Sequence, residues 1–108
     1  MLKQIKTQLP SKEKFIATIQ GKETALYYLK NKINLFAALT NYGARVVSLL
    51  VPDKNGSLTD INVGFDTIEK YIDAKDQCYG ATVGRYAGRI AGGKFSIDDI
   101  ESQLAVNN

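Results

Sequence analysis

Short apolar runs separated by turn residues make up most of this chain. Residues 33–40 alternate between two faces, whereas residues 44–51 form a nearly continuous β-branched and aliphatic run. Alternation is typical of a half-buried strand, and a continuous run is typical of a strand covered on both faces. A further strand is predicted over 24–30, with Asn31-Lys32 as a tight hairpin connection to the next one.

The clearest turn signal of the sequence lies just after the aliphatic run. Asn55-Gly56 supplies positive φ at little cost, and Pro52 opposes continuation of the preceding strand. Residues 58–65 then alternate, with odd-numbered positions on one face and even-numbered positions on the other. We therefore expect a return strand over 58–65 that has one buried and one wet face.

The periodicity changes after this predicted strand. Asp66, with Glu69 three residues later, is typical of a helix N-terminus, and the apolar residues up to Ile72 fall on one helical face. A short helix is therefore predicted over 66–72.

A second hairpin is predicted at the end of the chain, with strands at 94–97 and 102–106 that turn through Asp98-Asp99. Taken together, the pattern predicts a mainly β fold of antiparallel strands with one short helix.

Composition limits the class of protein. The length of 108 residues and the hydrophobic share of 44% suit one domain with a core. The net charge is +3. Lysines are concentrated near the start, but without an arginine stripe or a stacking pattern no nucleic-acid partner is expected. Residues 1–12 are expected to be a disordered arm, and residues 13–108 the domain.

Several kinds of site are not expected from the sequence. The chain has no histidine, and no residue cluster has the spacing of metal ligands, so neither a metal nor a cofactor is expected. Its one cysteine, Cys78, has no histidine to activate it and no partner for an internal disulfide. No apolar run has the length of a bilayer span or a secretion signal, so no membrane partner and a cytoplasmic location are expected.

The most informative stretch is 79–95, YGATVGRYAGRIAGGKF, in which five glycines surround Arg85 and Arg89. Glycine lets another group approach the backbone closely, and arginine supplies five donors and no acceptor. Such a loop can present donors to an oxygen-rich ligand such as a sugar. Arginines in a glycine-rich loop nevertheless lie on the surface more often than they contact a ligand.

This stretch lies within a longer ordered run, with TNYGARVVSLLVPDKNGSLTDINVGFDTIEKY before it and GKFSIDDIESQLAVNN after it. The whole run resembles the N-terminal part of the aldose 1-epimerases, the galactose mutarotases, and the likeness extends from about Thr24 to Asn108. The resemblance implies that residues 13–108 are the N-terminal, incomplete part of a galactose-mutarotase-like β-sandwich. It also implies an aldose sugar, galactose or glucose, as the partner.

The resemblance assigns a candidate binding site. Gly88-Arg89-Ile90 matches the family position at which an arginine enters the sugar site and hydrogen-bonds hydroxyl oxygens. Arg89 and Gly88 are thus the implied substrate-binding residues. Many relatives carry asparagine where this chain has Gly88, which offers only its backbone. Arg85 matches a variable position and is expected to be structural.

The resemblance assigns no catalytic residue to these 108 positions. Mutarotation needs a base for the C1 hydroxyl and an acid for the ring oxygen. In the family these are a glutamate and a histidine that lie further along the chain. The first hypothesis is therefore a truncated aldose 1-epimerase, inactive or nearly so by itself. The alternatives are a non-catalytic carbohydrate-binding or oligomerisation module, and an unrelated small β-domain.

The run at 44–51 bears on assembly, because it needs cover on two faces. An isolated piece of a β-sandwich would leave sheet faces and strand edges open. We therefore expect this chain to fold by partnering, as a homo-oligomer, with a complementing C-terminal part, or as a rearranged small sheet.

Overall fold

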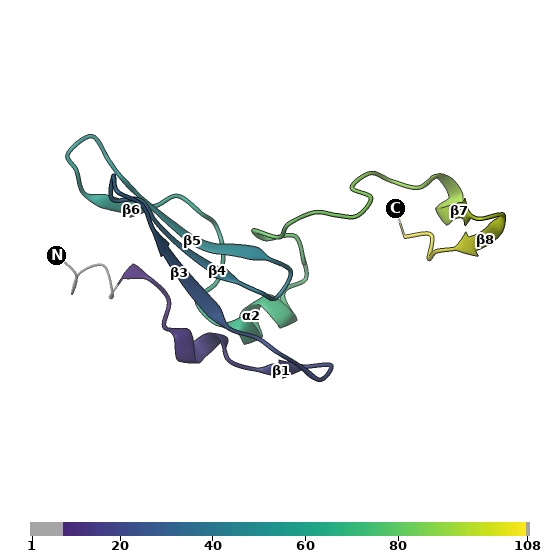
Figure 1. The fold of residues 1–108 in the computed structure, drawn as a ribbon, viewed down its shortest axis with the longest axis horizontal. Coiled ribbons are helices and arrows are strands. Elements are labelled where there is room, and N and C mark those ends of the chain that lie inside the picture. The colour runs from purple at the N-terminus through teal and green to yellow at the C-terminus, as the bar shows by residue number, and fades with distance from the viewer. Residues whose placement is uncertain (1–7, 108) are drawn as a thin grey trace.

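The computed structural model describes residues 8–107, with an antiparallel four-stranded sheet at its centre (Figure 1). In spatial order the sheet consists of β3 (Leu26–Lys30), β4 (Phe36–Thr40), β5 (Arg45–Pro52) and β6 (Leu58–Asp60). The remaining elements are η1 (Lys12–Phe15), β1 (Thr18–Ile19), β2 (Lys22–Glu23), α2 (Ile68–Asp73), η2 (Ala91–Gly93), β7 (Lys94–Ile97) and β8 (Ile100–Gln103). The predicted class, mainly antiparallel β with one short α-helix, is confirmed.

The molecule is elongated, with principal extents of 58 × 32 × 25 Å. The β7–β8 hairpin lies at one end, away from the central sheet, and an irregular segment after α2 joins the two (green to yellow in Figure 1). The glycine-rich stretch is therefore mostly loop, as predicted from its sequence.

The core lies on one face of the sheet. Even-numbered positions of β4 point inward: Ala38 packs with residues of α2 and η1, whereas Phe36 packs with Leu50. The Tyr71 ring lies 6.2 Å from that of Phe15 and 5.1 Å from that of Phe65, in tilted and edge-on arrangements that aromatic pairs prefer. The fully or almost fully buried members of this cluster are Phe15, Leu26, Ala38, Val47, Ile68 and Tyr71.

The opposite face of the sheet is open. In the register of the sheet, Leu29 of β3 is opposite Ala37, which in turn is opposite Leu49. Leu29 is 60% exposed, and Leu49 is only half-buried. Within residues 8–107 one face of 44–51 is covered, and the cover expected on its other face stays a prediction.

The return strand is shorter than predicted, because β6 ends at Asp60 instead of residue 65. Ile61 and Val63 are 59% and 76% exposed, so beyond Asp60 only Phe65 of the expected buried face packs against the core. At that point the Asp60 carboxylate accepts hydrogen bonds from the Ser48 hydroxyl and, at 3.0 Å, from the Leu49 amide.

A β-bulge interrupts the β4–β5 ladder, and the side chain of Asn62 binds the β5 backbone at the same place. Ala38 pairs with Ser48 and Leu39 with Val46, so Val47 is the extra residue. The side-chain amide of Asn62 donates to the carbonyls of Val46 and Val47 at 3.0 and 3.1 Å. The Asn62 side chain thus takes the place of backbone hydrogen bonds between the strands. Alternation of apolar and polar residues does not reveal this substitution.

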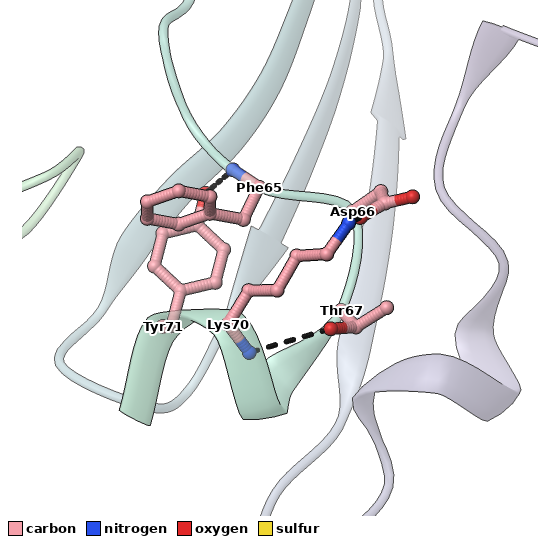
Figure 2. A network of polar contacts seen from close by, with 5 residues as sticks. All are labelled: Phe65, Asp66, Thr67, Lys70 and Tyr71. Carbon is pink, nitrogen blue, oxygen red and sulfur yellow. Dashed lines mark hydrogen bonds and ion pairs between the residues drawn. The ribbon is translucent and has the colours of Figure 1, made fainter. Parts of the chain in front are cut away.

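The helix begins two residues later than predicted, and Thr67 caps it instead of Asp66. Thr67 has the extended backbone of an N-cap, and its hydroxyl accepts from the Lys70 amide at 3.3 Å. Asp66 instead pairs with the Lys70 ammonium at 2.6 Å, and this hydrogen bond lowers the pKa of the Asp66 carboxyl. The Tyr71 hydroxyl accepts from the Phe65 amide, which fixes the approach to the helix (Figure 2).

The two ends of the chain compare differently with expectation. Of the predicted arm, residues 1–7 lie outside the described residues, whereas Leu9 packs against the core and Lys12 begins η1. The predicted terminal hairpin forms, but its second strand is Ile100–Gln103 instead of 102–106. Its turn places both Asp98 and Asp99 at positive φ, 49° and 61°. Within residues 8–107, no helix is long and apolar enough to cross a membrane.

Candidate functional site

A buried arginine anchors the start of the glycine-rich stretch. Arg45, only 6% exposed, donates from Nη1 to the carbonyls of Gln77 and Tyr79 at 2.8 and 2.9 Å. Its guanidinium carbon lies 5.1 and 5.5 Å from the ring centroids of Tyr42 and Tyr71, within range of a cation–π contact. The sequence pattern did not indicate this role, because Arg45 lies in a run that otherwise predicts a plain strand.

Backbone contacts hold the next residues against the start of β5. The Val46 amide donates to the Gly80 carbonyl at 2.9 Å, and Thr82 binds the carbonyls of Gly43 and Ala44. Gly80 has φ 63°, and a Cβ there would lie 2.2 Å from the Val46 carbonyl oxygen. Only glycine fits a position with both constraints. The first part of the glycine-rich stretch is therefore fixed on the sheet.

The far end of the stretch is anchored on β8 in a similar way. The Leu104 amide donates to the Gly93 carbonyl at 2.7 Å, and the Gln103 side-chain amide donates to the Gly92 carbonyl at 3.0 Å. Gly93 also has positive φ, 67°, and a Cβ there would lie 2.8 Å from the Leu104 carbonyl oxygen. These contacts place Arg89 between two anchors, one on β5 and one on β8.

The two predicted site residues, Gly88 and Arg89, line the same hollow. It has a volume of about 360 Å³, within the range of small-molecule sites. Within residues 8–107, no hydrogen bond or ion pair engages the exposed Arg89 guanidinium. The other lining residues come from the same segment and from the end of the chain: Tyr86, Ile90, Gly92, Gly93, Leu104, Ala105, Val106 and Asn107.

Arg85 does not line the hollow that Arg89 lines. It borders a neighbouring hollow of about 570 Å³, which is almost entirely apolar and includes Phe95 and Ile97. The resemblance assigns Arg89 to the sugar site and Arg85 to a variable position. The two arginines also border different hollows. Within residues 8–107, no group of three or more His, Cys, Asp or Glu side chains is placed to hold a metal ion.

Comparison with known proteins identifies the family of this chain. The sequence profile of the family described as aldose 1-epimerase matches residues 25–108. This match covers well over half of the chain, so the chain belongs to the aldose 1-epimerase family. Membership in this family excludes the alternative of an unrelated small β-domain.

Individual relatives agree with this family. The chain is 41% identical over 70 residues to a galactose mutarotase of Bos taurus, covering 65% of this chain and 20% of that protein. It is 41% identical over 68 residues to a probable aldose 1-epimerase of Arthroderma benhamiae, covering 60% and 16%. The chain thus spans about a fifth of the length of these relatives.

A solved structure supports the same fold. The crystal structure of a GalM/aldose epimerase homologue from C. elegans superposes with a TM-score of 0.68 at 37% identity. The match covers 79% of this chain and 26% of the homologue. The antiparallel strands and the short helix therefore follow the fold of this family.

Proposed function

We propose that this chain supplies the arginine-bearing part of the sugar site of an aldose 1-epimerase, which interconverts the α and β anomers of an aldose such as galactose or glucose. The observation that carries the proposal is the position of Arg89, whose guanidinium is exposed at a small hollow beside the bare backbone of Gly88. A guanidinium offers five fixed donors, which suit the several hydroxyl oxygens of a pyranose.

The chemistry of the hollow supports binding and not proton transfer. The side chains that line it include no carboxylate, histidine or lysine, and an arginine does not deprotonate in proteins. A general base and a general acid each contribute about 10²–10⁴-fold to such reactions. We therefore propose that Arg89 holds and polarises the sugar, while the acid and base come from sequence outside these 108 residues. By this account the chain by itself is inactive or nearly so.

The open face of the sheet supports a role within a larger assembly. Leu29 and Leu49 lie on this face with no described element packed over them. Large exposed apolar patches mark interaction surfaces in soluble proteins. A second copy of the chain and a complementing C-terminal part are the two covers we propose.

The binding role of Arg89 is tested by replacing it. We expect Arg89→Ala to weaken binding of galactose about tenfold or more, because the charge-assisted hydrogen bonds to the hydroxyls are lost. Titration with galactose, followed by amide chemical shifts near residue 89, measures this change. Arg85→Ala is the matched control, since Arg85 is exposed in the same segment but borders the other hollow. Equal affinities for Arg89→Ala and the unmodified chain would contradict the proposed function.

A further inference from the structure

Tyr86 is the exposed aromatic residue beside Arg89. Its side chain is 69% exposed and lines the hollow together with Gly88 and Arg89. A Cβ built on Gly88 would lie 3.4 Å from Cε1 of the Tyr86 ring and 3.6 Å from its hydroxyl oxygen. The ring thus lies against position 88, where glycine has no side chain to extend into the hollow.

The chemistry of a pyranose calls for a partner that Arg89 does not provide. A sugar ring has hydroxyl edges and a patch of C–H groups, and its hydroxyls donate as well as accept. Arginine donates only, whereas a tyrosine hydroxyl donates and accepts, and the face of its ring carries partial negative charge that attracts C–H groups. Besides Arg89, the polar side chains that line the hollow are those of Tyr86 and Asn107.

We propose that Tyr86 is a second sugar-contacting residue, whose ring stacks on the C–H face of an aldopyranose that Arg89 holds by its hydroxyls. This inference rests on the proposed function, because it requires that the hollow beside Arg89 be the sugar site. Gly88 has a part in the arrangement, since it leaves the space beside the ring open for the ligand.

Tyr86 also borders the apolar hollow that contains Phe95 and Ile97, which offers a competing role. In that role the ring would pack against another apolar surface and would not contact sugar. Removal of the ring weakens sugar binding only in the first role, so a binding measurement distinguishes the two roles.

The test uses the 108-residue chain and methyl β-D-galactopyranoside, whose locked anomeric centre allows binding without mutarotation. Saturation-transfer difference NMR gives its affinity and shows which sugar protons lie against the protein. We expect Tyr86→Ala to weaken binding about three- to tenfold and to remove the transfer to the C–H face, as loss of a stacked aromatic contact implies. Tyr86→Phe should retain that transfer, and Tyr27→Ala, at an exposed tyrosine on β3, should change nothing.

The outcomes separate this inference from the proposed function. Weak binding by Arg89→Ala together with unchanged binding by Tyr86→Ala would overturn the role of Tyr86 and leave that of Arg89. Unchanged binding by both variants, or no saturable binding by the unmodified chain, would overturn the proposed function and this inference with it. Amide spectra of each variant verify that the fold is retained, as expected for substitutions of exposed side chains.

Discussion

Replacing Gly80 with alanine is expected to destabilise the chain by about 3 kcal/mol, through backbone strain and overpacking together. The new Cβ would lie 2.2 Å from the carbonyl oxygen of Val46, an atom of the sheet backbone that cannot move aside cheaply. The substitution would also force a residue that has a side chain to adopt a φ of 63°. Urea unfolding followed by far-ultraviolet circular dichroism measures the loss.

Gly92→Ala is the matched control for this prediction. Gly92 has the same φ, 63°, but a Cβ there meets nothing within 4 Å. Gly92→Ala should therefore lower the free energy of unfolding only by the strain of the left-handed backbone, about 1 kcal/mol. Equal losses for the two variants would show that the close approach of residue 80 to β5 does not constrain the fold.

Arg45→Met is expected to have the second large effect, a loss of about 2–3 kcal/mol. Methionine keeps an apolar stem between Tyr42 and Tyr71 but leaves the carbonyls of Gln77 and Tyr79 without their donor. The loss should be concentrated where the glycine-rich stretch meets β5. Hydrogen exchange of the Val46 amide, which donates to Gly80, should accelerate more than exchange of the amides in the central strand β4.

Arg45→Lys distinguishes the two contributions of this side chain. Lysine keeps the positive charge near the aromatic rings, but as a point charge it does not reproduce the fork of the guanidinium. We expect a loss smaller than that of methionine. Unchanged exchange at Val46 in Arg45→Met would contradict the role of Arg45 as an anchor of the stretch.

Local patterns predicted the central strands, but β4 begins at Phe36, so residues 31–35 and not Asn31-Lys32 alone connect it to β3. Alternation over 33–40 and the aliphatic run at 44–51 contain β4 and most of β5, and the turn residues between them form turns. The prediction for 58–65 was wrong beyond Asp60 because alternation indicates the direction of side chains and not their partners. The carboxylate of Asp60 and the amide of Asn62 bind the backbone of β5 and thereby end the pairing.

Arg89 and Arg45 show which residues of the candidate site can be predicted from the sequence. Arg89 was selected by its match to the family, and it lines a hollow with Gly88. Arg45 was not selected, because its partners are carbonyls more than thirty residues later, and no local pattern encodes that pairing. The prediction that Asp66 caps the helix was wrong for a related reason. Asp66 and Thr67 are both good caps, and only the backbone conformation decides between them.

Polarimetry of freshly dissolved α-galactose, with and without the chain, tests the central claim most directly. The claim is that these 108 residues bind and orient the sugar but lack the acid and base of mutarotation. It predicts that the optical rotation relaxes no faster with the chain than in buffer alone. Acceleration that disappears in Arg89→Ala would contradict it, because carboxylates within this chain would then perform the proton transfers.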